Sequence, residues 1–133
     1  MSTGIKNLSQ ILRTLTPTLA SEQYVYCTIP VSREIDVNAL KPLATIRETE
    51  GLTLILALET AKEYGFAYQG PYRCITLKVH SSLEAVGLTA AVSHALAHHQ
   101  IPANMLAGYF HDHILLPDAK AEAAMAILSE LSD

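Results

Sequence analysis

A serine-rich segment that runs directly into a helix-forming stretch is the part of the sequence best suited to hold a small anion. It extends from His80 to Val92. The first turn of any helix exposes unpaired backbone N–H groups and a partial positive charge, so a carboxylate or phosphate can bind there without a basic side chain. Gly87 would let a ligand approach the backbone closely, because it carries no Cβ. The alternative is ordinary capping, in which Ser81 or Ser82 accepts a helix N–H and no ligand binds.

Two carboxylates could receive a positively charged group near this segment. Glu84 would favour a cationic side chain or an α-amino group and would repel an acidic ligand. Asp112 lies in a predicted hairpin turn and could pair with an ammonium or guanidinium group through a charge-assisted hydrogen bond. The alternative for Asp112 is a turn residue that bonds its own backbone.

Six histidines raise a metal hypothesis, which their surroundings disfavour. His94 and His98 are spaced to share a metal on a helix, and His111 and His113 could do so on a strand. No cysteine or carboxylate stands at the close spacing of a structural zinc site. We therefore expect neither a metal nor a cofactor.

Catalysis has equally little support in the sequence. Ser81 or Ser82, His80 and Asp112 could be combined into a nucleophilic triad on paper. The chain has no nucleophile elbow, phosphate loop or dinucleotide-binding fingerprint to anchor such a triad. We expect a protein that is not an enzyme.

Composition limits the class of protein further. The chain has 133 residues and 14.4 kDa, enough for one compact domain or two very small ones that share a core. Half of its residues are apolar and 17% are charged, which excludes intrinsic disorder. The net charge is -4 and no basic run occurs, so we expect neither nucleic acid nor a membrane as a partner. Two cysteines are too few for a disulfide framework, which favours reduced thiols and a cytoplasmic location.

Alternating and helical patterns predict the elements that must position these residues. Two apolar runs around a short polar segment predict a hairpin over 43–57, and a linker is expected over 69–71. The remaining expectations are helices and strands bounded by Pro and Gly: helix 8–15, strand 24–29, helix 60–64, strand 73–80, helix 84–100, hairpin 105–116 and a final helix from 118.

The two halves repeat a strand–turn–strand–helix order, at 43–64 and again at 105–131. Each half is too short to bury a core of its own, so the two must share a core or a continuous sheet. The order of the second half is ferredoxin-like. We therefore predict an α+β fold with antiparallel sheets and helices packed on one face, divided into an N-terminal unit, 1–69, and a C-terminal unit, 70–133.

The second half also resembles a known family. The run HSSLEAVGLTAAVSHALAHHQIPANMLAGYFHDHILLP is similar to the ACT domain, with Val79, Gly87, a helix to Gln100, and Ile101 with Asn104 at characteristic places. With TIRETEGLTLILA from the first half, the whole chain resembles small stand-alone bacterial proteins that hold two ACT-like units in tandem. Tandem ACT units also form the regulatory part of aspartate kinases and the cytosolic arginine sensors of animals, and the HDHILLP block is similar to the acidic site segment of those sensors.

The resemblance implies a ligand site where two ACT units meet. The ligand carboxylate would bind backbone N–H groups at Val86 and Gly87, and a positive group would bind Asp112 with Glu84. The resemblance further implies that Ser82 and Asn104 orient polar groups of the ligand. It also implies that Thr53 and Leu54 of the first unit line the cleft.

The expected function is reversible binding of an amino acid or related metabolite by a sensor or regulatory protein. We expect a homodimer, because exposed edge strands in such small sheets need covering, and a regulated metabolic enzyme as a further partner. The alternative is a ligand-free ACT-fold module for protein interaction or dimerisation.

Overall fold

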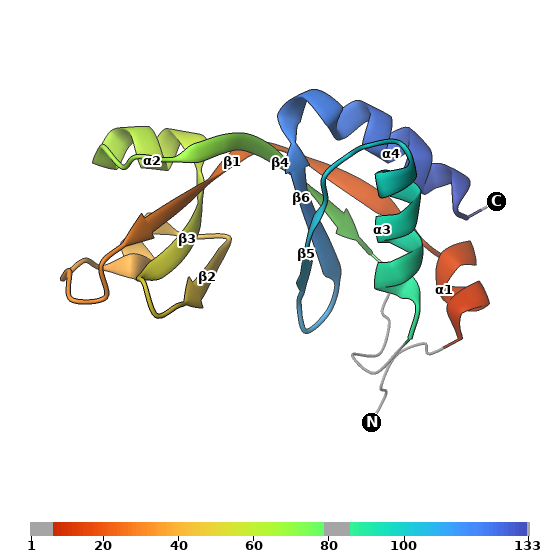
Figure 1. Ribbon diagram of the computed structural model, residues 1–133, viewed down its shortest axis with the longest axis horizontal. Coiled ribbons are helices and arrows are strands. Elements are labelled where there is room, and N and C mark those ends of the chain that lie inside the picture. The colour runs from red at the N-terminus through yellow and green to blue at the C-terminus, as the bar shows by residue number, and fades with distance from the viewer. Residues whose placement is uncertain (1–6, 79–85, 133) are drawn as a thin grey trace. The chain divides into compact units, whose positions relative to one another are not determined.

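The computed structural model describes residues 7–78 and 86–132, which form helices and an antiparallel sheet (Figure 1). The strands are hydrogen-bonded in the order β2-β3-β1-β4-β6-β5. This confirms the predicted α+β class and ferredoxin-like fold. The elements in chain order are α1 (Leu8–Arg13), β1 (Pro17–Ile29), η1 (Val37–Leu40), β2 (Ala44–Arg47), β3 (Leu52–Ala57), α2 (Leu58–Tyr64), β4 (Gln69–Leu77), α3 (Leu88–His98), β5 (Asn104–Ala107), β6 (Asp112–Pro117), η2 (Asp118–Lys120) and α4 (Ala121–Glu130).

Two compact units share the chain. Unit 1 consists of Met1–Ser21 and Arg73–Asp133, and unit 2 consists of Glu22–Tyr72. The expected division after residue 69 makes each unit one continuous segment. Unit 1 is instead built from two segments, because it includes the first 21 residues of the chain. Strands β1 and β4 each contribute residues to both units.

Unit 2 has the strand order β2-β3-β1-β4, which is the ferredoxin-like order. Its core forms because alternate residues of β1 and β3 point to one face, where α2 and the single turn of η1 cover them. The fully or nearly fully buried side chains of this core are Val25, Cys27, Ile29, Leu40, Leu54, Leu56, Ala61 and Phe66. The predicted hairpin is present as β2 and β3, and Gly65 ends α2 in a left-handed conformation.

Unit 1 repeats the same order as β1-β4-β6-β5, with residues 17–21 of β1 as its fourth strand. Alternate residues of β4 and β6 face α3 and α4, and α1 joins the same core. Its buried side chains include Ile11, Leu15, Ile75, Leu77, Leu88, Val92, Leu96, Ile114, Leu116, Ala124 and Leu128. Fully burying a Leu or Ile stabilises a fold by about 1.5–3 kcal/mol, so this cluster holds α1, α3 and α4 on one face of the sheet.

The expected linker over 69–71 is wrong, because these residues begin β4. Within unit 2, β4 is the edge strand, and a proline is tolerated on an edge because its missing N–H leaves no ladder bond unmade. Pro71 can therefore lie inside a strand. Among the described residues, no helix has the length and hydrophobicity needed to cross a membrane.

Candidate functional site

The N-terminal end of α3 lies in unit 1 and carries no side-chain cap from the described residues. Its N-cap is Gly87, in the left-handed region with φ 105°, and the first backbone bond of the helix runs from the Ala91 N–H to the Gly87 carbonyl at 2.8 Å. The preceding Val86 side chain is 83% exposed. Among the described residues, no side chain occupies the amides of the first turn. Ser82 and Glu84, also expected here, lie outside the described residues.

Gly87 has a packing role as well as a conformational one. A Cβ placed on this residue would lie 2.9 Å from Cδ2 of Leu8 in α1. Helix α1 therefore covers the α-carbon of Gly87, and the space that we expected for a ligand on that side is filled by Leu8.

The β5–β6 turn lies at the same end of unit 1 as the start of α3 (Figure 1). The chain order requires this, since β5 starts soon after α3 ends and returns alongside it. Asp112, which was expected in the hairpin turn, is instead the first residue of β6. It shares a face with Ile114 and Leu116, which belong to the helix-covered core. The structure thus brings Asp112 to the same end and face as the start of α3.

The Asp112 carboxylate is half-buried and makes no hydrogen bond or ion pair with a described residue. Burial raises its pKa, and the nearby positive charges of His113 and His111 act in the opposite direction. Burial also lowers the pKa of His113, as does His111, while Asp112 opposes them. The His113 ring is fixed by Thr76, whose Oγ1 lies 2.9 Å from Nδ1. The site therefore holds a partly desolvated acid without a partner among the described residues, next to a histidine whose charged form is disfavoured by burial.

Asn104 is not brought together with Asp112. In the β5–β6 register Asn104 lies opposite Leu115, while Asp112 lies opposite Ala107, so the two residues are at different ends of the hairpin and on different faces. The Asn104 Nδ2 donates to the Leu115 carbonyl at 3.3 Å. Asn104 thus stabilises the hairpin, and the expectation that it joins Asp112 in a site is not met.

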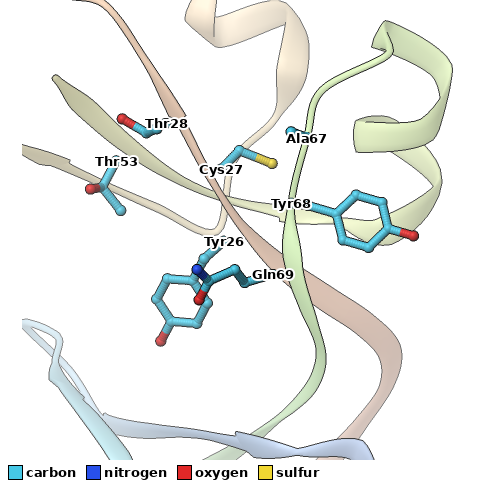
Figure 2. Close-up of a pocket in the computed structure, with 7 residues that line it drawn as sticks. All are labelled: Tyr26, Cys27, Thr28, Thr53, Ala67, Tyr68 and Gln69. Carbon is cyan, nitrogen blue, oxygen red and sulfur yellow. The ribbon is translucent and has the colours of Figure 1, made fainter.

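A separate cavity of about 470 Å³ lies wholly within unit 2 (Figure 2). Thr53 lines it and donates a hydrogen bond to the Glu48 carboxylate. Leu54 is not among its lining residues and is fully buried in the core. The remaining lining residues come from β1 and from the segment that leads into β4: Tyr26, Cys27, Thr28, Ala67, Tyr68 and Gln69.

The sequence reasoning missed these lining residues. The available signal was the alternation in 24–29, which places Tyr26 and Thr28 on the face opposite the core, with Thr28 directly opposite Thr53 across the strands. Tyr68 and Gln69 were not predicted to line a cavity, because a linker was expected to begin at Gln69, directly after Tyr68. Burial raises the pKa of the Cys27 thiol, so this cysteine is protonated at neutral pH and is a poor nucleophile.

The histidines of α3 lie close together without forming a metal site. The rings of His94 and His98 are 6.5 Å apart and stacked. In the part of the chain that the structure describes, no group of three or more His, Cys, Asp or Glu residues could hold a metal ion.

Two protein-family models match the sequence, both described as the ACT domain. One matches residues 3–73 and the other residues 69–130. No curated protein matches the chain.

Solved structures similar to this one support the same fold. A Vibrio cholerae protein of unknown function, described as a possible transport protein, is 45% identical, with 98% of this chain and 99% of that chain covered and a TM-score of 0.86. An Agrobacterium tumefaciens protein has 13% identity, 89% coverage of each chain and a TM-score of 0.75. The regulatory subunit of aspartate kinase from Thermus flavus has 10% identity, covers 90% of this chain and 99% of that one, and has a TM-score of 0.65.

Proposed function

Because the chain belongs to the ACT-domain family and carries two ACT domains in tandem, we propose that it is a regulatory sensor of a small amino acid or related metabolite. The fold it shares with a regulatory subunit of aspartate kinase supports a regulatory, non-catalytic role. The proposed partner of the ligand-bound protein is a metabolic enzyme, and the proposed location is the cytoplasm.

The observation that carries the proposal is the half-buried Asp112 carboxylate, which has no partner among the described residues and lies at the same end and face of unit 1 as the start of α3, where no described side chain caps the helix. An amino acid has the two charges that such a site can receive. Its carboxylate would bind the α3 amides that follow Gly87, where the helix dipole favours an anion. Its ammonium group, or a cationic side chain, would bind Asp112 by a charge-assisted hydrogen bond. Ser82 and Glu84 remain proposed contributors to the same site.

A screen of the twenty amino acids by thermal unfolding of the full chain tests this function. A ligand present at 100 times its dissociation constant stabilises the folded state by about 2.7 kcal/mol. An amino acid that raises the melting temperature is then titrated by calorimetry into the unmodified protein and into the Asp112→Asn variant. We expect the variant to bind about tenfold more weakly or worse, because a charged hydrogen bond is lost. Glu122→Gln, an exposed acid on α4 in the same unit, is the control for loss of one negative charge.

Two results would contradict the proposal. The absence of any melting shift with all twenty amino acids would remove the ligand class. Equal affinity of the Asp112→Asn variant and the unmodified protein would show that the ligand binds elsewhere, and would overturn the proposed site but not the proposed ligand class.

Sedimentation of the same samples tests the proposed homodimer, for which the sheet offers the edge strands β2 and β5. A single monomeric species at all concentrations would overturn that part.

A ligand-free interaction module is the second candidate, and one observation favours it. The turn before Asp112 exposes an aromatic pair, Tyr109 at 71% and Phe110 at 64%, with ring centroids 4.9 Å apart. Exposed neighbouring aromatics are typical of protein-binding surfaces. An interaction module predicts that no amino acid shifts the melting temperature, so the same screen separates the two candidates.

A further inference from the structure

The cavity of about 470 Å³ in unit 2 is walled in part by residues of β1 and β3 that face away from the unit 2 core. Tyr26, Thr28 and Thr53 alternate along these strands with buried core residues, so their side chains lie on the opposite face of the sheet (Figure 2). Small-molecule sites have volumes of about 300–1,000 Å³. The cavity is therefore large enough for a ligand, and the chemistry of its wall indicates which class of ligand it suits.

The wall of this cavity is uncharged. Its seven lining residues all fall in the part of the chain that the structure describes, and they are of the types Tyr, Cys, Thr, Ala and Gln. A charge in contact with the wall is negative, because the Glu48 carboxylate accepts a hydrogen bond from Thr53. A ligand carboxylate would meet no cation among the lining residues and would be repelled by Glu48. The cavity therefore favours a neutral ligand.

Two threonine hydroxyls give the wall a hydrogen-bond donor beside an acceptor. Thr28 in β1 lies directly opposite Thr53 in β3, a pairing that places two Cβ atoms about 4.5–5.5 Å apart. Thr53 donates its proton to Glu48, so its Oγ1 offers only lone pairs to a ligand. The Thr28 side chain makes no hydrogen bond with a described residue, so its hydroxyl can donate. A cyclic amide, which has an N–H beside a C=O, matches this pair.

The Tyr26 ring supplies a flat apolar surface next to these hydroxyls. It makes a T-shaped contact with Tyr72, with ring centroids 5.2 Å apart and an angle of 79° between the planes, and this contact fixes its orientation. Tyr26 is half-buried, so part of its ring is accessible to a ligand. Planar heterocycles stack on such rings through their π-faces.

The side-chain amide of Gln69 adds a further polar group to the wall. It carries both N–H donors and a carbonyl acceptor, so it can bind either kind of polar atom on a ligand. The wall thus combines a flat ring with neutral donors and acceptors, which is the set of groups that recognises a planar polar ring.

We propose that this cavity binds a neutral planar heterocycle with a cyclic-amide edge, of the kind found in a pyrimidine base. The ring stacks on Tyr26, its N–H donates to Oγ1 of Thr53, and the adjacent carbonyl accepts from the Thr28 hydroxyl. Gln69 binds a second polar atom of the ring. The site lies in unit 2 and takes an uncharged ligand, and it does not depend on the amino-acid site proposed at Asp112.

Titration of the full-length protein with uracil, followed by amide chemical shifts in NMR, tests the proposal. We expect saturable shifts at Tyr26, Thr28 and Thr53. Gly87 and Asp112, which belong to the other proposed site, should not shift. The absence of any shift with uracil, or shifts confined to Gly87 and Asp112, would overturn the proposal, and the first of these results would leave the amino-acid site standing.

Three analogues of uracil separate the contributions to binding. N,N′-dimethyluracil keeps the planar ring without the N–H donors, dihydrouracil keeps the amide edge without the planar aromatic ring, and orotate adds a carboxylate to the same ring. Each should bind about fivefold more weakly or worse than uracil. Equal binding of any one of them would overturn the proposal.

Paired variants complete the test. Thr28→Val removes the hydroxyl at an exposed strand position and should weaken uracil binding about fivefold. Thr45→Val, at an exposed position of β2 outside the cavity lining, should leave binding unchanged. Tyr26→Leu should weaken binding about tenfold, whereas Tyr24→Leu, on the same face of β1 and outside the lining, should not. Equal effects within either pair would overturn the proposal.

Discussion

His113 is a residue whose protonation is coupled to the folding of unit 1. Its Nδ1 lies 2.9 Å from Thr76 Oγ1, and its Nε2 lies 3.2 Å from the place where a Cβ on Gly108 would be. Burial, with a smaller contribution from His111, lowers its pKa from 6.5, and Asp112 only partly opposes this. The folded protein therefore binds this proton less readily than the unfolded chain does.

The direction of the pH effect follows from proton linkage. A histidine with a lowered pKa contributes stability that is fully present above its unfolded pKa of 6.5 and is lost as the pH falls below it. Asp112 has the opposite sign, because burial raises its pKa in the folded state. Its contribution is present below 3.8 and is lost as the pH rises above that value. The His113 window begins at 6.5 and the Asp112 window at 3.8, so the pH range just below 7 tests His113 first.

We predict that the free energy of unfolding falls between pH 7 and pH 5.5, and that His113→Gln flattens this slope. One proton can change stability by at most about 1.4 kcal/mol per pH unit, and partial exposure of the ring reduces the effect below that limit. Urea unfolding at each pH gives the measurement. His94→Gln, at an exposed position on α3, is the control and should keep the original slope. If His113→Gln kept it too, another group would carry the pH dependence.

At the scale of elements, local apolar and polar patterns were sufficient to predict a strand wherever it pairs with the next strand in the sequence. The β2–β3 and β5–β6 hairpins were predicted because apolar runs flank short polar turns. The second turn was expected over 111–113, whereas it lies between Ala107 and Asp112. The first half of β1 was missed, since residues 17–21 become a strand by completing a sheet with residues more than fifty positions away. Arg73 illustrates this, because its guanidinium donates to the Ala20 carbonyl at 2.7 Å. Such long-range pairing leaves no mark in a local pattern.

The candidate site was predictable to a similar degree. Asp112 could be proposed because a carboxylate next to a hairpin turn is visible in the sequence, and Gly87 because it stands before an apolar helix; both remain predictions as ligand-binding residues. The face of each strand residue depends on where the strand begins, which propensity does not fix. For that reason Asn104 and Leu54 were assigned to a cleft from which the observed register turns them away.

The contact between α1 and the start of α3 gives an element-scale prediction. Gly87→Ala should destabilise the protein by about 2 kcal/mol or more. The positive φ strains the backbone, and the new methyl group also clashes with Leu8. Gly65→Ala, at φ 71° with no atom within 4 Å of its Cβ, should cost only the strain of about 1–2 kcal/mol.

A double-mutant cycle isolates the contact itself. Leu8→Ala removes the side chain that the new methyl group would meet, so it should offset part of the Gly87→Ala cost, with a coupling of about 0.5 kcal/mol or more. The same cycle with Gly65→Ala should be additive within about 0.5 kcal/mol, because Gly65 and Leu8 belong to different units. Unfolding free energies from urea titration supply all the terms. Additivity at Gly87 would mean that α1 does not pack against it in solution.

At the scale of the whole molecule, the sequence order and the folding units do not coincide. Unit 1 needs residues from both ends of the chain, because its core includes Ile11 at 0% and Leu15 at 5% exposure, and residues 17–21 supply its fourth strand. A C-terminal fragment therefore lacks part of its own core. With two large side chains missing, each contributing about 1.5–3 kcal/mol, a unit this small has too little remaining stability to fold.

We predict that a fragment of residues 70–133 is unfolded, whereas a permuted chain that joins residues 73–132 through a glycine–serine linker to residues 7–21 folds. Far-UV circular dichroism should show helix only in the permuted chain, and urea should unfold that chain in one cooperative transition. The permuted chain with both Ile11 and Leu15 changed to Ser keeps its length and loses the core contacts, so it should behave like the fragment. Cooperative folding of residues 70–133 alone would show instead that the unit is contiguous in sequence and that the N-terminal segment is dispensable to it.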